Sequence, residues 1–386
     1  MALFSPIWGL GVYTVAFATA IGFVALSPYC RAISRYSSDR YAGIDGLRGY
    51  LAIGVFVTHS ASIKQWQEVG TWTWPDSDFF VMVGTAPVAT FFMITAFLFW
   101  EKAIRARGRV NLAWLLRSRL RRLAPLYLFA IPVFFILIGI ASQWAIRTNS
   151  LSLIMDGSRW LALGMGGQPD INGVRPAWVF YPQVWTLQYE WVFYVALPAL
   201  AWFWRPIPSL LIAAATAIAA KLGFLNIVVV NFTIGILTAE LIELLPKVDW
   251  LKSRSVSALA LGAIVACPFC GGSFYGLRQT ICLAPLFISV CYGNRMFGLL
   301  ANAPARLLGA ISYSTYLLHA FLLHFFVLAV NKVSSVASLS PGAYWAAILV
   351  LTSVLVAICT LTFRFIEQPW ITRDSQPVTP RGLPGF

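Results

Sequence analysis

The sequence has few charged residues and few of the side chains that build metal or nucleotide sites. Only 11% of its 386 residues are charged, whereas soluble domains carry about 25%. Its three histidines are dispersed and its six cysteines lack zinc-ligand spacing, so we expect no metal centre. It contains no glycine-rich loop of the Walker or Rossmann type. The net charge of +14 comes without a basic soluble domain, so nucleic-acid binding explains it poorly.

Long apolar runs dominate the sequence. The chain is 59% hydrophobic with a mean hydropathy of +0.75, and runs of membrane-spanning character recur about eleven times along it. The first run is long for a signal-peptide core and lacks a small-residue cleavage site, so we interpret it as a retained span. We predict an all-α integral membrane protein with about eleven transmembrane helices. Their expected ranges are 7–26, 48–63, 79–100, 123–145, 179–203, 209–222, 227–245, 255–268, 281–292, 307–330 and 343–365.

The distribution of basic residues predicts the orientation. If the N-terminus lies outside, one set of connections holds most of the Lys and Arg residues, including the eight between Glu101 and Arg122. Positively charged loops stay on the cytoplasmic side of a membrane. We therefore expect a cytoplasmic C-terminus and an outside N-terminus.

Arg48 and His59 stand eleven residues apart on one apolar span. Eleven residues make three helical turns plus roughly 20°, so the two side chains share a face. They are separated by roughly 16 Å along the axis, about half of the hydrocarbon core. Because ionisable residues inside a membrane are costly, their default interpretation is functional. A cation at the membrane edge and an imidazole near the midplane suggest a passage for a long ligand that enters end-on.

The basic segment 101–122 has two interpretations. The first is topology together with contacts to anionic membrane lipids. The second is a phosphate clamp, because Arg119 and Arg122 lie three residues apart and share a helix face. Arginine binds phosphate oxygens through two parallel N–H groups. The spacing alone leaves both interpretations open.

Two further ionisable residues fall deep in predicted spans. Glu190 is the one carboxylate deep in the span 179–203, where it needs a partner. It could orient His59, pair with an arginine, or link two helices as a structural residue. His319 lies about 13 residues beyond Arg306, again near the midplane. It could contact a substrate or hydrogen-bond across helices.

Six short motifs, in order, resemble the membrane acyltransferase type 3 family. The first is Ile-Asp-Gly-Leu-Arg-Gly at 44–49, followed by His59, which gives the family's Arg-x10-His hallmark. The others are Phe-Phe-Met-Ile-Thr-Ala-Phe-Leu at 91–98, the Arg-rich run before Pro at 119–125, Trp-Thr-Leu-Gln-Tyr-Glu at 185–190, Ile-Ser-Tyr-Ser-Thr-Tyr-Leu-Leu-His at 311–319 and Phe-Ile-Glu-Gln-Pro at 365–369. Ala96 replaces a glycine of the family, a small-for-small change that should keep helices close.

The resemblance implies a domain organisation. Residues 41–370 would form a ten-helix acyltransferase core, and residues 1–40 would add an extra N-terminal span with a basic cytoplasmic loop. Residues 371–386 would form a short cytoplasmic tail. We expect the stand-alone form of the family, without a fused esterase-like domain.

The resemblance also implies the chemistry. Members move an acyl group, usually acetyl, from cytoplasmic acyl-CoA to a hydroxyl of a glycan or glycolipid on the other side of the membrane. Arg48, Arg119 and Arg122 would then hold the phosphates of CoA. His59 would act as a general base or as a nucleophile, with Glu190 and His319 in support. The alternative is a transporter or flippase of a glycan or glycolipid, which would also bury Arg, His and Glu. The sequence leaves the acceptor and the oligomeric state open.

Overall fold

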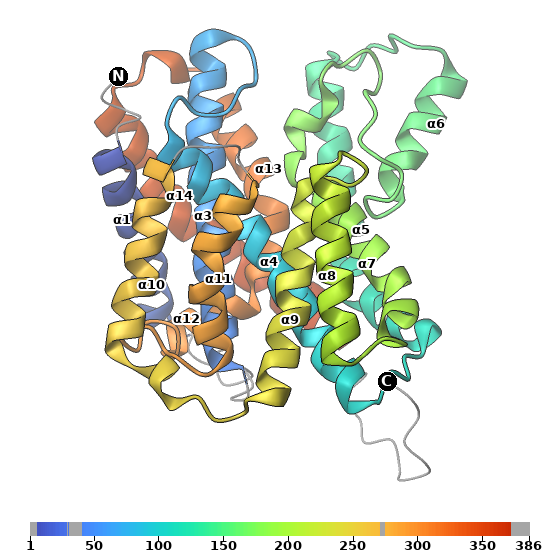
Figure 1. Cartoon of the computed structure of the whole chain (residues 1–386). Coiled ribbons are helices and arrows are strands. Elements are labelled where there is room, and N and C mark those ends of the chain that lie inside the picture. Colours follow the sequence, from blue (N-terminus) through green and yellow to red (C-terminus); the bar gives the residue numbers. More distant parts are fainter. Residues whose placement is uncertain (1–5, 29, 31–40, 271–274, 372–386) are drawn as a thin grey trace.

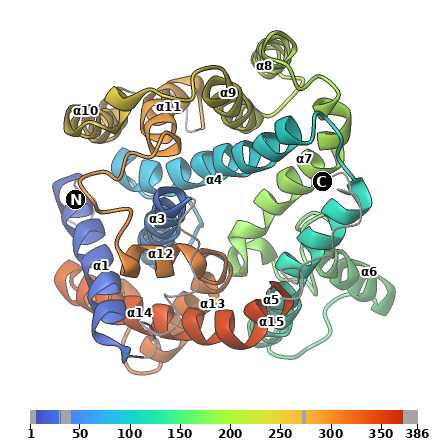
Figure 2. The ribbon, with the colours of Figure 1, turned by 90° about the horizontal axis from the view of Figure 1, so that it is seen from below.

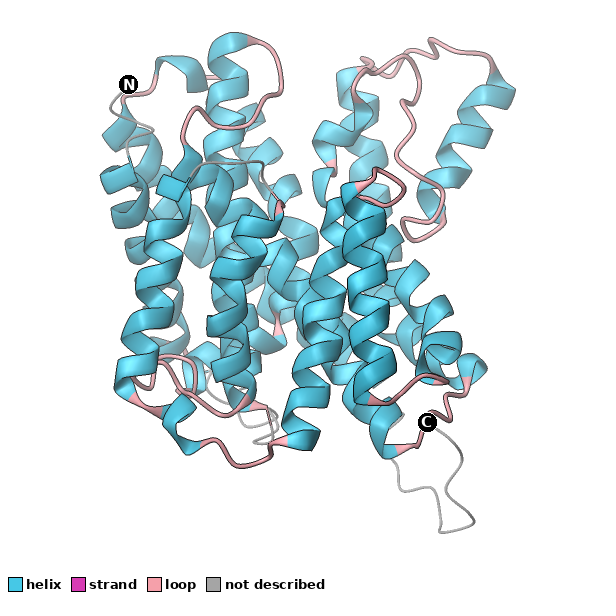
Figure 3. Ribbon diagram, viewed as in Figure 1, coloured by secondary structure: helices cyan, strands magenta, loops and turns pink. Residues whose placement is uncertain are grey.

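The structure is a bundle of helices. It is a computed structural model that describes residues 6–28, 30, 41–270 and 275–371 (Figure 1). The helices are α1 (Pro6–Leu26), α3 (Ala42–Val69), α4 (Asp78–Arg105), α5 (Leu112–Ala141), α6 (Ser150–Leu161), α7 (Trp185–Ala201), α8 (Pro206–Lys221), α9 (Val230–Leu244), α10 (Arg254–Ala266), α11 (Leu277–Cys291), α12 (Ala303–Ala310), α13 (Ser312–Val330), α14 (Pro341–Thr362) and α15 (Gln368–Ile371). Figure 3 shows no strand among the described residues.

These helices confirm the predicted fold class. Each of the eleven predicted ranges overlaps a helix in the described part of the chain, and six helices are long and apolar enough to cross a membrane. The predicted basic loop at 31–40 and nearly all of the predicted tail lie outside the described residues.

Three local features differ from the sequence prediction. α5 begins at Leu112, so half of the basic segment is helical; the side chain of Asn111 caps it by accepting from the N–H of Trp114. α7 begins at Trp185 rather than near 179, because two short 3₁₀ turns, the second opened by Pro182, precede it. α6 was not predicted; it is a 12-residue helix at the edge of the bundle (Figure 1).

α3 runs through the middle of the bundle. Figure 2 shows it end-on, with α4 on one side and α12 and α13 on the other, and these three helices contact it extensively. α9 packs on the far side of α4, in a row with α8, α10 and α11. The helix that carries both Arg48 and His59 therefore has protein on all sides.

Glycines allow α12 and the turn before it to approach the beginning of α3. A Cβ atom at Gly46 would lie 1.9 Å from the carbonyl oxygen of Leu300, and one at Gly309 would lie 1.8 Å from that of Asp45. Only a residue without a side chain fits at such a distance. This close packing fixes α3 at the level of Arg48. Ala96 likewise faces a glycine, because a Cβ on Gly235 would lie 2.8 Å from its own.

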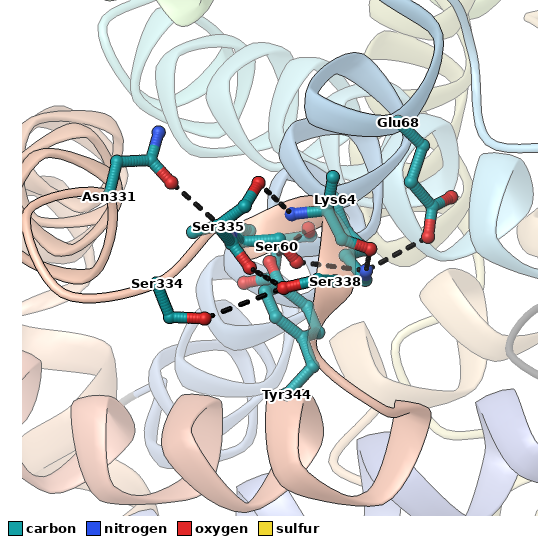
Figure 4. Close-up of polar contacts among 10 residues, drawn as sticks. Ser60, Lys64, Glu68, Asn331, Ser334, Ser335, Ser338 and Tyr344 are labelled. Carbon is teal, nitrogen blue, oxygen red and sulfur yellow. Dashed lines mark hydrogen bonds and ion pairs between the residues drawn. The ribbon is translucent and has the colours of Figure 1, made fainter.

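A buried lysine fixes the other end of α3. The Lys64 side chain is only 1% exposed, and its Nζ donates to the carbonyl oxygens of Val336 (2.9 Å) and Ala337 (2.8 Å). It also pairs with Glu68 at 2.9 Å (Figure 4). The three N–H groups of the ammonium thus have three acceptors. This contact ties the connection between α13 and α14 to α3, one and a half turns beyond His59.

Candidate active site

His59 meets His319 across the α3–α13 interface. Nδ1 of His59 lies 2.6 Å from Nε2 of His319, and the rings are nearly parallel, with centroids 4.9 Å apart. His319 is fully buried. His59 is half-buried, although every other residue from 51 to 64 is buried, because its ring faces a cavity. The hydrogen bond across helices that the sequence allowed for His319 is present.

The hydrogen bonds of this pair define which nitrogen of His59 is free. Nδ1 of His319 lies 3.0 Å from the carbonyl oxygen of Thr315, which can only accept, so that nitrogen carries the hydrogen. With both rings neutral, Nε2 of His319 is then an acceptor, and Nδ1 of His59 must donate to it. Nε2 of His59 is left with a free lone pair, as a general base or nucleophile requires.

His59 lines a cavity of about 520 Å³, here called the outer cavity. It lies towards the end of α3, under the connection that leads to α4. Its wall is largely aromatic and has no titratable side chain besides the histidine itself. The other lining residues are Trp72, Trp74, Trp178, Trp185, Ser62, Thr73, Gln168 and Pro182. Flat aromatic faces with a few hydrogen-bonding groups suit a ring that is apolar on its faces and carries hydroxyls on its edge.

A second cavity of about 340 Å³, here called the inner cavity, lies near the beginning of α3. It brings together all three arginines predicted to bind phosphate, from α3 and α5, and Glu190 from α7. Arg119 and Arg122 share a face of α5, as their spacing predicts. Arg48 is 3.7 Å from Asp45, one turn earlier on α3.

The guanidinium of Arg119 packs against aromatic rings, and one of its hydrogen-bond donors has no partner among the described residues. Its guanidinium carbon lies 4.8 Å from the ring centre of Phe99 and 5.9 Å from that of Tyr194. Its Nε is buried and has no hydrogen-bond partner among the described residues. A buried donor without a partner is rare in folded proteins. An anion in the inner cavity would supply the missing acceptor.

Arg122 has a partner that sequence reasoning missed. Glu367 is fully buried, lies 3.2 Å from Arg122 and accepts a hydrogen bond from the hydroxyl of Ser314. A π-helical turn at Phe363–Glu367 ends α14 and presents this carboxylate to α5. The sequence offered a signal, since Glu367 is the one acidic residue between 250 and 370. Its partner lies on a helix 245 positions earlier, which no periodicity reveals.

Glu190 lies with the arginines rather than beside His59. Its carboxylate accepts from the hydroxyl of Tyr194 at 2.9 Å, one turn along α7, and it lines the inner cavity. The ring partner of His59 is His319. Of the three roles that the sequence left open for Glu190, this position near the arginines favours an interaction with Arg over contact with His59.

The two cavities are separate, although the sequence predicted one passage. Tyr316 from α13 and Thr186 from α7 line the inner cavity, and their hydroxyl oxygens are 2.8 Å apart. The Tyr316 hydroxyl also donates to the carbonyl oxygen of Gln183 at 3.3 Å. The neighbouring residues Pro182 and Trp185 line the outer cavity. These contacts form a barrier between Arg48 and His59.

Metal ligation has no support in the described part of the chain, where no three His, Cys, Asp or Glu side chains gather.

One comparison with known proteins agrees with this architecture. The family model described as "Acyltransferase domain" matches residues 41–364, which is most of the chain and includes every residue that lines the two cavities except Ile371. The comparison with curated proteins gave no match, and neither did that with solved structures. The match begins just before α3 and ends in the π-helical turn that carries Glu367. The chain belongs to the membrane acyltransferase type 3 family.

Proposed function

We propose that this acyltransferase moves an acyl group, most simply acetyl, from acyl-CoA to a hydroxyl of a glycan or glycolipid on the opposite side of the membrane. The observation that carries the proposal is the His59–His319 pair, which leaves one imidazole nitrogen free at the wall of an aromatic cavity. The inner end of the bundle would face the cytoplasm of a bacterium, because the basic residues gather there.

The inner cavity is the proposed donor site. The nucleotide part of CoA carries phosphates, which arginine binds bidentately. Arg48 and Arg119 are the principal candidates, and Arg122 contributes the N–H groups that Glu367 leaves free. Glu190 acts on the donor side, since it holds Tyr194, whose ring lies against the Arg119 guanidinium.

The outer cavity is the proposed acceptor site. Tryptophan faces stack on the C–H faces of a sugar ring, while Gln168 and Thr73 offer hydrogen bonds to its hydroxyls. The lining contains no lysine, arginine or carboxylate. An uncharged sugar unit therefore fits this cavity better than a phosphorylated or carboxylated one.

The reaction needs one base and one acid, and His59 supplies both. Its Nε2 takes the proton of the acceptor hydroxyl while the hydroxyl oxygen attacks the thioester carbonyl carbon. The carbon–sulfur bond then breaks, and the imidazolium returns the proton to the leaving thiolate, giving the ester and CoA. His319 keeps the hydrogen of His59 on Nδ1 throughout. In the nucleophilic variant, Nε2 attacks the carbonyl carbon first, the carbon–sulfur bond breaks and CoA leaves as the thiolate. The acceptor hydroxyl then attacks the acyl-imidazolium, the carbon–nitrogen bond breaks, and the hydroxyl proton passes to the thiolate, which again gives the ester and CoA.

Transfer requires the thioester to pass the barrier at Tyr316. The hydroxyl contacts with Thr186 and Gln183 close the direct route in this conformation. We propose that the slender pantetheine arm displaces the Tyr316 ring, so that the donor enters the outer cavity only when it is bound.

Proteoliposomes test the function and its sidedness together. Purified protein is reconstituted, methyl β-glucoside is trapped inside, and acetyl-CoA is added outside; the opposite arrangement is the control. We expect acetylated glucoside, together with release of free CoA, in vesicles in which the inner end of the protein faces the acetyl-CoA. Uptake of the glucoside without thioester cleavage would contradict the proposal, and so would acetylation that needs both substrates on one side.

A further inference from the structure

A basic cavity lies away from the proposed active site, between the start of α10 and the connection that follows α11. Its volume is about 580 Å³. Lys252, Arg254 and Arg295 line it, and no carboxylate does. It lies at the lower end of the bundle in Figure 1, next to the connection between α9 and α10.

This cavity is independent of the donor cavity. The two share no lining residue. In Figure 2, α10 and α11 lie on the other side of α4 from α5 and α7, which carry Arg119 and Glu190. The binding of acyl-CoA in the inner cavity therefore leaves these cations unexplained.

The charges around the cavity are only partly compensated. Lys252 pairs with Asp249 at 2.8 Å, and both side chains are exposed. Arg254 and Arg295 have neither an ion pair nor a side-chain hydrogen bond in the residues that the structure describes. Both arginines are exposed, and an anion between them would offset the repulsion of their charges.

One buried side chain sets the shape of the cavity. Asn294 is 2% exposed and donates to the carbonyl oxygen of Leu251 at 2.8 Å. Its Oδ1 accepts from the hydroxyl of Ser257 (2.9 Å) and the N–H of Met296 (2.8 Å). The segments that carry Arg254 and Arg295 are thus tied together before any ligand arrives. Preorganisation of this kind lowers the entropic cost of binding.

The surroundings match the level of lipid headgroups. α11 has 15 residues, which span about 22 Å, less than the hydrocarbon thickness of about 30 Å. Short spans are accommodated by flanking cations and by local thinning of the bilayer. Phe297 and Leu299, close to Arg295 in sequence, are 54% and 48% exposed. Exposed apolar groups beside cations are typical of a membrane interface.

We infer that this cavity binds a phosphate ester, with Arg254 and Arg295 as its ligands. Arginine N–H groups pair with phosphate oxygens in a geometry that a carbonyl or hydroxyl ligand does not satisfy. An anionic phospholipid and a soluble phosphate ester present the same group, and the headgroup of a phospholipid would reach the cavity from the adjoining leaflet.

The test compares two double variants of the intact protein in detergent micelles. R254A/R295A removes the proposed ligands. R205A/K247A is the matched control, because it removes two exposed cations that do not line the cavity. Native mass spectrometry measures binding of phosphatidylglycerol and phosphatidylcholine, and calorimetry at fixed ionic strength measures binding of glycerol 3-phosphate. R254K/R295K and the melting temperature report on the fold.

We expect R254A/R295A to lose on the order of tenfold in affinity for a phosphate compound, since each cation near a membrane surface contributes severalfold. The control should change it by less than about twofold, and R254K/R295K should keep part of the binding. A loss confined to phosphatidylglycerol identifies the lipid as the source, and a loss for glycerol 3-phosphate includes the soluble ester. Equal losses in both double variants, or no loss in either, would overturn the inference. These measurements involve no acyl transfer, so they stand whatever the outcome for the proposed function.

Discussion

Nδ1 of His59 lies 2.6 Å from Nε2 of His319, although 260 positions separate the two residues in the chain. The contact depends on the relative height of α3 and α13. Gly46 sets that height at one end of α3 and Lys64 sets it at the other. The catalytic proposal thus rests on helix packing that reaches well beyond the two rings.

Replacing His319 tests its role as a positioning residue. H319F removes the acceptor for the Nδ1 hydrogen of His59, so the wrong tautomer becomes accessible. We expect kcat to fall by about 10²-fold with the KM for acetyl-CoA nearly unchanged. H319Q keeps an acceptor oxygen and should recover part of the loss.

The pH profile separates this role from a structural one. Loss of the hydrogen bond should move the pH at which activity is half-maximal in H319F, and H319Q should move it less. If both variants lose activity in proportion to folded protein, with unchanged profiles, His319 is structural only.

Arg48 tests the donor site. R48A removes one guanidinium from the inner cavity, and we expect donor affinity to fall about tenfold or more while acceptor affinity stays constant. R117A is the matched control, since Arg117 is exposed on the same basic segment and does not line the cavity. Binding of a non-hydrolysable acyl-CoA analogue provides the measurement. Equal weakening by both variants would point to general surface charge.

Glu367 tests whether Arg122 needs its buried partner. E367Q leaves the Arg122 guanidinium without a counter-charge, and breaking a buried pair costs roughly 3–5 kcal/mol. We expect a lower melting temperature and a weaker donor affinity. R122M/E367Q removes both charges and should recover stability but not donor affinity. Recovery of both would show that Arg122 serves the fold alone.

Substitutions of Tyr316 and Thr186 test the barrier between the cavities. Y316F and T186V each remove a hydrogen bond of about 0.5–1.5 kcal/mol, which favours the open state by roughly 2- to 10-fold. We expect faster hydrolysis of acetyl-CoA in the absence of an acceptor, because water and the thioester then meet more often. Release of free CoA measures this rate. If both variants hydrolyse acetyl-CoA at the wild-type rate, the thioester does not reach His59 past Tyr316.

Helical periodicity predicted a large part of this structure. The apolar runs gave the spans, and the three-residue spacing placed Arg119 and Arg122 on one face, where both now line the inner cavity. These features are local, so they follow from the 3.6-residue repeat. The prediction that Arg48 acts together with these two arginines came from the order of the family motifs rather than from helical spacing.

The remaining features depend on contacts between distant segments. The pairing of His59 with His319 needs the register of two helices, and the Arg122–Glu367 ion pair needs a π-helical turn. The barrier at Tyr316 escaped prediction because an alignment on one helix says nothing about side chains that enter from another. Sequence spacing gave the distance between Arg48 and His59 but not what lies between them.

The most direct test of the account is a single turnover with H59A, in which acetyl-CoA binding and acetyl transfer to methyl β-glucoside are measured on the same sample. H324A is the matched control, because His324 is a buried histidine of α13 that lines neither cavity. The account predicts that H59A binds acetyl-CoA within about twofold of the wild type and transfers acetyl on the order of 10²–10⁴-fold more slowly. Transfer by H59A at the wild-type rate would contradict it.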